Sequence, residues 1–515
     1  MNKYNFLKYI LCIALSMLCC LSCYEDKGNY DYVDINKVEI EGLEDKYTIG
    51  MEEAITIKPI HKSSIAGNED HYKYEWICIS LQIGTTIYRN YVVSTDKYLE
   101  NKWLKLPGGS YTFYYKVTDT KTGIEWFSKN FTIEVLNEIT KGFVILSDVD
   151  NKTRVDYISN FNDNLNLKLD VLSKVNSKYP DFGQPISVAC YADPNSPKMN
   201  ATTEDGQYAV CILTTTGAYR LHPGNFTYDP LYNLSYNYIG SAPSDFIAMR
   251  IYDGTFLVDN SNNLYYYYRV GNLFWTMGIY TNVTVDNKFI KIGPEVASFG
   301  LSGAVMYDVD TKSFVCHKNR LKYSGYYSSS DETEFDGLLF KFNNTGKDVM
   351  YLFGRSTTAY TLMKDPVSNE VFLGAFNYTT GVQSFYIKLN LPDLLNAKEY
   401  AMGHYAANST IDQFLYYRTD NKIYMYNMSD GDNKLVYTAP SGNIITSMKF
   451  NKNGTWKNYL NVATYDPSKP KDSCGKFEIL EVTPLYGDLT LAEYNGEKMV
   501  WSGFGKIVDI EWKTK

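Results

Sequence analysis

The chain is 515 residues long, which is more than a single core usually serves, so we expect two or more domains or a repeat architecture. The formal net charge is −8 at pH 7, and it becomes −10 once residues 1–22, with two lysines and no acidic residue, are set aside. This acidic balance argues against nucleic acid or an anionic membrane surface as a partner bound through bulk charge.

Residues 1–22 have the layout of a secretory signal peptide. Lys3 and Lys8 precede the apolar run Tyr9–Leu21, which is 13 residues long. A helix that spans a bilayer needs about 20 apolar residues, so this run is too short to be one. The sequence therefore predicts export of the mature chain.

The apolar run ends in Leu21-Ser22-Cys23, a small residue followed by cysteine. This ending resembles a bacterial lipoprotein signal, in which the signal peptide is removed and the new N-terminal cysteine is acylated. The resemblance implies that Cys23 is the lipidation site and that several acyl chains hold the protein stably on its membrane. Cys20 departs from the pattern, since an aliphatic residue is usual there. The alternative is an ordinary signal peptide with a coincidental cysteine.

Residues 33–140 consist of short alternating strands separated by turn residues, the pattern of a β-sandwich. Three stretches resemble those of a PKD domain, an immunoglobulin-like sandwich: YEW at Tyr74–Trp76, GGSYTFYYKVTD at Gly108–Asp119 and TG at Thr122–Gly123. The resemblance implies that Trp76 packs in the core and that the glycine pair precedes a central strand.

The order of anchor, acidic tether and sandwich resembles the PKD-like surface lipoproteins of Bacteroidetes. Residues 23–32 would form the tether, and the resemblance implies that Glu25 and Asp26 act as an export signal to the cell surface. It also implies a lipid-anchored location on the outside of the outer membrane. There the protein would be an accessory to a nutrient-uptake system of the Sus (starch-utilisation) type, beside a SusC/SusD-like transporter complex.

From residue 141 to residue 515 the pattern changes to a series of strand–turn–strand units with Asp, Asn, Thr or Gly in each turn. Seven such units begin at Gly142, Gly206, Asp253, Gly303, Asn369, Asp412 and Asn458. One hairpin per unit at this spacing is typical of a β-propeller, whose blades are four-stranded sheets. We therefore predict an all-β protein, an immunoglobulin-like (PKD-like) β-sandwich followed by a seven-bladed β-propeller. The terminal strand at Gly505–Lys513 would complete the first blade and remove an unpaired edge.

The motifs of common catalytic and metal sites are missing from the sequence. Five scattered histidines form no HExxH or HxH pair, and no GxSxG occurs. Besides Cys23, the mature chain keeps five widely spaced cysteines without a CxxC pair, which suggests neither a disulfide scaffold nor a zinc site. Asp-rich runs at Asp148, Asp308 and Ser429 lack the EF-hand pattern, and hairpin turns are favoured over calcium binding. We expect no catalytic residue, no metal and no cofactor.

The 48 tyrosines fit a large all-β protein, because strands favour aromatic residues, but they also suit a recognition surface. The stretch RLKYSGYYSSSDE (Arg320–Glu332) places Tyr323, Tyr326 and Tyr327 in a Gly/Ser-rich, loop-like setting where they would be exposed. Exposed loop aromatics mark contact surfaces, so we predict that these three tyrosines touch a ligand or partner. Burial in the core is the alternative.

These features together predict a non-catalytic binding or accessory subunit at the cell surface, with a glycan or a peptide as its ligand. Two alternatives stay open. One is a surface-anchored propeller hydrolase or lyase that acts on polysaccharide. The other is a purely structural subunit that docks on a transporter.

Overall fold

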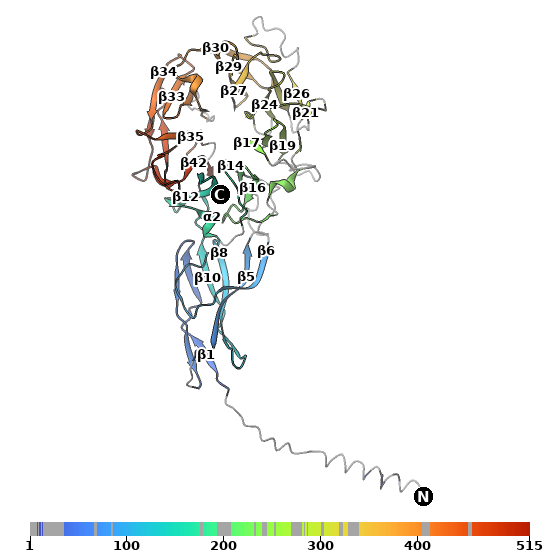
Figure 1. Cartoon of the computed structure of the whole chain (residues 1–515), viewed down its shortest axis with the longest axis vertical. Coiled ribbons are helices and arrows are strands. Elements are labelled where there is room, and N and C mark those ends of the chain that lie inside the picture. The colour runs from blue at the N-terminus through green and yellow to red at the C-terminus, as the bar shows by residue number, and fades with distance from the viewer. Residues whose placement is uncertain are drawn as a thin grey trace.

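The computed structural model of the protein describes residues 8, 10, 11, 13 and 35–514, except 66–68, 84–85, 176–178, 193–207, 231–232, 239–244, 252–253, 269–280, 283, 286, 300–302, 319–322, 328–338, 404–412 and 452–455. These residues form a β-sandwich below a ring of β-sheets (Figure 1). None of the helices among them is long and apolar enough to cross a bilayer. The fold is all-β, a sandwich followed by a propeller, as the sequence predicted.

The sandwich combines one large sheet with two small ones. The large sheet has the order β2 (Lys46–Gly50), β10 (Phe131–Leu136), β8 (Gly109–Asp119), β5 (Tyr72–Ile83) and β6 (Thr86–Ser94), with β9 (Glu125–Phe127) also paired to β8. The small sheets pair β1 (Val38–Glu41) with β4 (Ile60–Ser63) and β3 (Ile55–Ile57) with β7 (Leu99–Lys102). β10 runs parallel to β2 and antiparallel to β8.

The core of the sandwich follows from strict alternation along its central strand. In β8, every second residue from Tyr111 to Asp119 is buried, which is the period of a strand with one face against the core. Trp76 is completely buried against Tyr115, and its Nε1 donates to the Asp96 carbonyl at 2.9 Å. At Gly108 a Cβ would lie 2.8 Å from Asn137 Cα, so only glycine fits there. Trp76 and the glycine have the structural roles that the sequence predicted.

Seven sheets follow one another around the ring in the part of the chain that the structure describes (Figure 1), and we number them blade 1 to blade 7. Blade 1 is β13 (Asn164–Lys168), β12 (Lys152–Phe161), β11 (Lys141–Val149) and β42 (Lys506–Lys513); blade 2 is β14 (Pro185–Ala192), β15 (Tyr208–Thr214) and β16 (Gly217–Leu221). Blade 3 is β17 (Phe246–Ile251), β18 (Gly254–Asp259), β19 (Leu264–Tyr268) and β20 (Thr281–Asn282). Blade 4 is β22 (Lys288–Phe289), β21 (Thr284–Val285), β26 (Tyr323–Tyr326), β25 (Ser313–Lys318), β24 (Gly303–Asp308) and β23 (Ala297–Ser298).

In the remaining three blades, neighbouring strands pair antiparallel. Blade 5 is β27 (Asp348–Arg355), β28 (Thr358–Lys364), β29 (Val371–Asn377) and β30 (Gln383–Leu389); blade 6 is β31 (Glu399–Met402), β32 (Phe414–Arg418), β33 (Lys422–Asn427) and β34 (Asn433–Thr438). Blade 7 is β35 (Ile444–Phe450), β36 (Leu460–Tyr465), β37 (Gly475–Val482) and β38 (Leu489–Leu491), with β41 (Val500–Phe504) also on β37. A small hairpin of β39 (Glu493–Tyr494) and β40 (Glu497–Lys498) and the short helices α2 (Val171–Lys174), η3 (Leu234–Asn237) and η5 (Leu394–Asn396) complete the elements.

The ring closes through a strand from the end of the chain. β42 pairs antiparallel with β11 from Gly142↔Lys513 to Asp148↔Lys506, so blade 1 is built from both ends of the propeller sequence. Phe143 and Trp512, opposite one another in this pairing, have ring centroids 4.7 Å apart. The prediction that the terminal strand completes the first blade is confirmed, and the pairing removes an edge that would otherwise be open.

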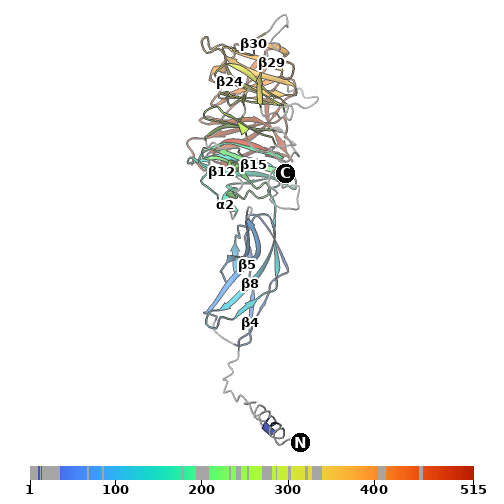
Figure 2. The same cartoon turned by 90° about the vertical axis from the view of Figure 1, so that its right-hand side faces the viewer.

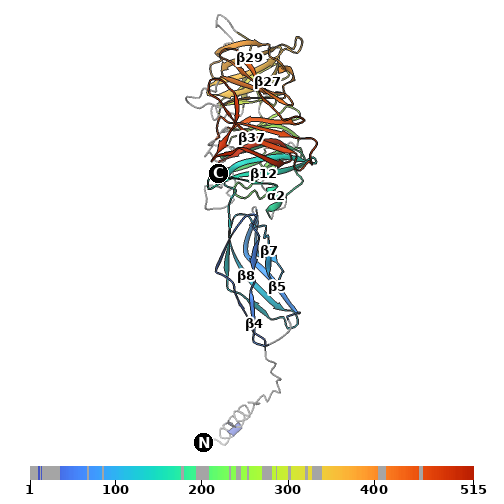
Figure 3. The ribbon, with the colours of Figure 1, turned by 90° about the vertical axis from the view of Figure 1, so that its left-hand side faces the viewer.

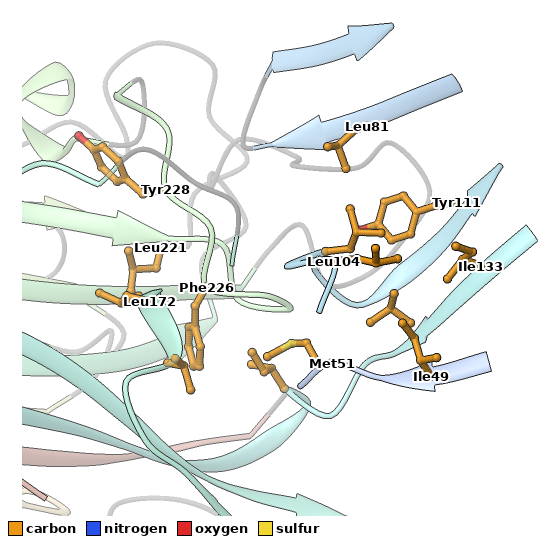
Figure 4. Close-up of a cluster of buried hydrophobic side chains, with 14 of the residues drawn as sticks. Ile49, Met51, Leu81, Leu104, Tyr111, Ile133, Leu172, Leu221, Phe226 and Tyr228 are labelled. Carbon is orange, nitrogen blue, oxygen red and sulfur yellow. The ribbon is translucent and has the colours of Figure 1, made fainter. Parts of the chain in front are cut away.

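The sandwich and the propeller share one hydrophobic core instead of meeting at a flexible linker. Met51 and Leu104 from the sandwich belong to the same buried cluster as Leu172, Leu221 and Phe226 from blades 1 and 2, as Figure 4 shows. Charged contacts surround it, among them Lys174 Nζ to Glu52 Oε2 at 2.7 Å. The propeller stands on edge above the sandwich, which meets it at the rim of blades 1 and 2 and leaves both faces of the ring uncovered (Figures 2 and 3).

Candidate ligand-binding site

A pocket of about 320 Å³ lies on blade 4. Two strands of this blade, β21 and β26, lie at the rim of the ring, away from the sandwich (Figure 1). Three segments build it: the short hairpin of β21 and β22 with the residues after it, the turn between β24 and β25, and strand β26. It is lined by Val285, Lys288, Phe289, Ile290, Lys291, Asp308, Asp310, Thr311 and Tyr326. Its volume is within the usual range for small-molecule sites, roughly 300–1,000 Å³.

The Asp308 carboxylate connects two of the segments that build the pocket through hydrogen bonds. Its side chain is buried and accepts four hydrogen bonds: from Tyr326 Oη at 2.6 Å, from Thr311 Oγ1 at 2.7 Å, and from the backbone N–H groups of Asp310 at 3.0 Å and Thr311 at 3.4 Å. The two backbone bonds form the tight turn that the Asp-rich run predicted. Both oxygens of Asp308 are therefore engaged inside the protein, and this carboxylate holds Tyr326 and the turn in place.

Two aromatic side chains of the pocket reach solvent, Phe289 with 70% and Tyr326 with 36% of its surface exposed. Partial burial, together with the hydrogen bond to Asp308, raises the pKa of Tyr326 to about 12, so its hydroxyl stays protonated at neutral pH. The two rings offer apolar faces beside polar groups, a combination found where proteins bind amphipathic molecules.

The charged groups of the pocket differ in how many of their hydrogen-bonding positions are already used within the protein. Lys291 Nζ donates to the Ser261 carbonyl at 2.7 Å, which leaves two of its three donors for other partners. Lys288 is exposed, and so is Asp310. Among the described residues, neither lysine forms an ion pair and the Asp310 carboxylate has no cation within salt-bridge distance. The pocket thus offers two ammonium groups and one carboxylate to a ligand.

The structure separates the three tyrosines that the sequence grouped as a contact surface. Tyr326 lines the pocket. Tyr323 begins β26, but its side chain lies outside what the structure describes. The expected exposure of Tyr327 is wrong, because only 2% of it is exposed and its hydroxyl donates to the Tyr378 carbonyl at 2.9 Å.

The physical reason for this correction is that Gly325 and Tyr326 belong to strand β26 and Tyr327 follows directly after it. β26 pairs with β25 through Val315↔Tyr326 and Cys316↔Gly325, so neighbouring side chains point to opposite faces of the sheet. Tyr326 points to the pocket, and Tyr327 packs on Phe342 with ring centroids 4.6 Å apart. The sequence analysis missed Phe289 and the lysines. The alternation in TVDNKFIKI, with a turn at Asp-Asn, was the signal that would have marked an exposed hairpin.

Several other predicted features fall on residues with no described structure. Cys23, Glu25 and Asp26 lie outside the described residues, so lipidation and the export signal stay predictions. In the part of the chain that is described, no group of three or more His, Cys, Asp or Glu side chains could hold a metal ion. The Asp148 and Asn427 side chains, like that of Asp308, accept backbone N–H groups of their own turns.

Cys78, Cys190, Cys211, Cys316 and Cys474 are all buried, and none of these five side chains is in a disulfide bond. His317 lies in β25 and is buried, with Nδ1 3.1 Å from Ser324 Oγ. Neither the cysteines nor His317 suggests a second candidate site.

The first part of the chain matches a known protein family. Residues 23–180 match the PKD-like family. This segment is less than half of the chain, and it runs past the sandwich through β11–β13 and α2 of blade 1. No curated protein sequence matches.

Solved structures resemble the chain only distantly. YCF48 from Cyanidioschyzon merolae is similar at 9% identity, with a TM-score of 0.34 over 65% of this chain and 97% of that one. The dihydro-heme d1 dehydrogenase NirN has 6% identity and a TM-score of 0.36 over 85% of this chain and 75% of that one. The extracellular domain of BT4673, a protein of B. thetaiotaomicron described as a putative one-component system, has 14% identity and a TM-score of 0.32 over 62% of this chain and 37% of that one.

Proposed function

We propose that this protein is a lipid-anchored lipoprotein on the outer surface of a Bacteroidetes cell, where it binds a glycan without chemical turnover as an accessory of a Sus-type uptake system. The signal-like run ending at Cys23 supports the anchor, and the PKD-like match at residues 23–180 supports the family context. The pocket on blade 4 is the observation that carries the binding role.

The pocket suits a sugar ring better than a peptide side chain alone. A hexose presents an apolar C–H face and a rim of hydroxyl groups, so it needs aromatic faces beside polar groups. Phe289 and Tyr326 provide the faces, while Asp310 and the two lysines provide the acceptor and donors. A few placed polar groups around apolar surface are how small-ligand sites gain specificity.

The hydrogen bonding of Asp308 supports binding over catalysis. A general acid or base must exchange a proton with its substrate, and this carboxylate already accepts four internal hydrogen bonds. Its role is to position Tyr326.

The shape of the molecule supports an accessory role at a membrane. The β1 end of the sandwich lies far from the propeller, so an anchor that precedes β1 would leave the propeller as the outermost part (Figure 1). The shared core between the two parts would hold the ring on edge, so that the sandwich covers neither face of the ring (Figure 2).

The binding role is tested with the secreted form of the whole mature chain, in which Cys23 is replaced by serine. We expect a glycan array to identify a ligand, and Phe289→Ala with Tyr326→Ala to reduce its affinity at least tenfold, since an aromatic anchor often contributes about 2 kcal/mol. Tyr486→Ala is the matched control, an exposed tyrosine on blade 7. Binding only to peptides, or product release that survives repurification, would replace this proposal.

The anchor and the accessory role are tested in cells. Cys23→Ala should abolish labelling by a palmitate analogue and release the protein from the membrane fraction, and retained label would refute lipidation at Cys23. Pull-down of the tagged lipoprotein from detergent-solubilised outer membranes should recover a transporter and its lid protein. Recovery of the bait alone at wild-type abundance would count against the accessory role.

A further inference from the structure

The turn between β37 and β38, residues 483–488 on blade 7, presents two large apolar side chains to solvent. Leu485 is 63% exposed, and Tyr486 beside it is 68% exposed. Single exposed apolar residues are ordinary on a protein surface and need no explanation. In the described chain, however, no other pair of consecutive large apolar residues is exposed to this extent.

The backbone at Leu485 is in the left-handed region, with φ at +71°. Bulky L-residues rarely adopt this conformation, and Asn or Asp stands at most of the non-glycine positions where the described chain has a positive φ. The other apolar residue in this set is Phe226, which is buried in the shared core. Leu485 thus combines a strained backbone with an exposed side chain. Stability alone does not favour that combination, which is typical of functional positions.

Hydrogen bonds hold the turn in this conformation. The Gly487 N–H donates to the Thr483 carbonyl at 2.9 Å, and the Asp488 N–H donates to Thr483 Oγ1 at 2.9 Å. Blade 6 supports the base of the turn, because Tyr416 Oη donates to the Gly487 carbonyl at 2.9 Å and Lys434 Nζ lies 2.7 Å from Asp488 Oδ1. A turn held in this way loses little conformational entropy when a partner covers it.

This turn and the pocket on blade 4 lie on opposite faces of the ring. Counted outward from the centre of the ring, β37 and β38 are the third and fourth strands of blade 7. β24 and β25, whose turn lines the pocket, are the second and third strands of blade 4. Since successive strands in each blade run antiparallel, turns of these two kinds emerge on opposite faces of a propeller. A partner on the turn therefore leaves the pocket open.

We propose that Leu485 and Tyr486 dock into an apolar cleft of a protein partner, on the face of the ring opposite the pocket. This inference rests on the proposed accessory role and names the surface that meets the partner. Tyrosine is enriched among the residues that contribute most to protein interfaces. A stable interface buries about 1,200–2,000 Å², so the two side chains are the anchor of a wider contact.

The position and shape of the turn favour a protein over other partners. Small ligands bind in concave sites, whereas the tip of a turn is convex. The β1 end of the sandwich, on the side of the proposed anchor, lies far from the ring, which keeps the turn away from the anchoring membrane (Figure 1). Two copies of this chain that met through a twofold axis at the turn would place two convex surfaces against each other and bury little area.

The test is photo-crosslinking on the full lipid-anchored chain in its native cells. Tyr486 and, as the control, Val367 are each replaced by the photo-reactive amino acid p-benzoylphenylalanine. Val367 is also an exposed apolar turn residue, but it lies between the second and third strands of blade 5, on the face of the pocket. We expect position 486 to form a discrete adduct with one other protein, mapped by mass spectrometry to an apolar cleft, and position 367 not to form it.

Leu485→Asn separates docking from folding. Asparagine tolerates the left-handed region, so this variant should be at least as stable as the wild type in urea. Its affinity for the purified crosslinked partner, measured by calorimetry on the whole mature chain with Cys23→Ser, should fall at least tenfold. Val367→Asn is the matched control and should keep the affinity. Glycan binding should be the same in both variants.

The outcomes separate this inference from the accessory role. An adduct with lipid alone, or with a second copy of this chain, would overturn the protein partner. No adduct at position 486, while pull-down still recovers a transporter, would refute the docking surface and leave the accessory role in place; loss of both would overturn both. An unchanged affinity for the partner in Leu485→Asn with Tyr486→Ala would place the docking surface elsewhere on the protein.

Discussion

Lys449 Nζ on β35 lies 3.0 Å from Asp509 Oδ1 on β42, so an ion pair joins blade 7 to blade 1 where the ring closes. The same ammonium lies 2.7 Å from Glu511 Oε2. Asp509 Oδ2 also accepts the Val188 N–H of blade 2 at 2.9 Å, so one carboxylate connects three blades. Burial opposes the charge on Lys449, but the two carboxylates outweigh it and raise the pKa of the lysine.

Lys449→Met should strongly destabilise the protein. The substitution leaves Asp509 and Glu511 side by side, largely buried and without their cation, a situation that typically costs about 3–5 kcal/mol. The measurement is the free energy of unfolding in urea. Lys498→Met, at an exposed position, should change it by no more than about 0.5 kcal/mol. An equal, small effect of both variants would mean that the ion pair does not secure the closure.

The shared core predicts that the sandwich and the propeller unfold together. Met51 and Phe226 lie on opposite sides of the junction in one buried cluster, so each should stabilise both parts. Phe226→Ala should cost about 3–5 kcal/mol and lower a single calorimetric transition, while Phe127→Ala, at an exposed position on the sandwich, should not. Two separate transitions, of which only one responds to Phe226→Ala, would contradict a common core.

The pH dependence of stability should contain a contribution from His317. Burial lowers the pKa of its imidazole to about 4, below the ordinary value of 6.5. Between these values the unfolded chain binds a proton that the folded chain does not, so stability falls as the pH drops below about 6.5 and is unaffected above it. His317→Gln should therefore lose about 2 kcal/mol less than the wild type when the pH is lowered from about 7 to about 5. Parallel pH profiles from urea unfolding would refute this.

Much of the fold was accessible from the sequence because local patterns determine it. The alternation along β8 and the one hairpin per unit in the propeller both reflect strands with one buried face. The terminal strand β42 has no neighbour in sequence to pair with, so it needs a distant partner such as β11. The shared core was not predictable, because buried residues such as Met51 and Phe226 have the same pattern whether they pack within a domain or between two. The match to the PKD-like family continues into blade 1, across this same junction.

The candidate site was harder to predict for a related reason. Tyr326 is the last residue of β26 and Tyr327 follows it, so the two side chains point in different directions, and a shift of one residue in the register would exchange them. The sequence identified the right segment but not the register. Phe289 sits on the two-residue strand β22, where the alternating pattern indicates an exposed hairpin but not that the ring lines a pocket.

The two adjacent tyrosines should therefore give opposite results on substitution. Tyr327→Phe removes the hydroxyl that donates to the Tyr378 carbonyl in the core, so it should lower the free energy of unfolding by about 1 kcal/mol and leave ligand affinity unchanged. Tyr326→Ala removes a half-exposed ring of the pocket, so it should weaken ligand binding about tenfold with a smaller effect on stability. Urea unfolding and calorimetric titration on the same preparations distinguish the two roles. Loss of affinity in Tyr327→Phe at unchanged stability would mean that the face of β26 that binds ligand is the opposite one.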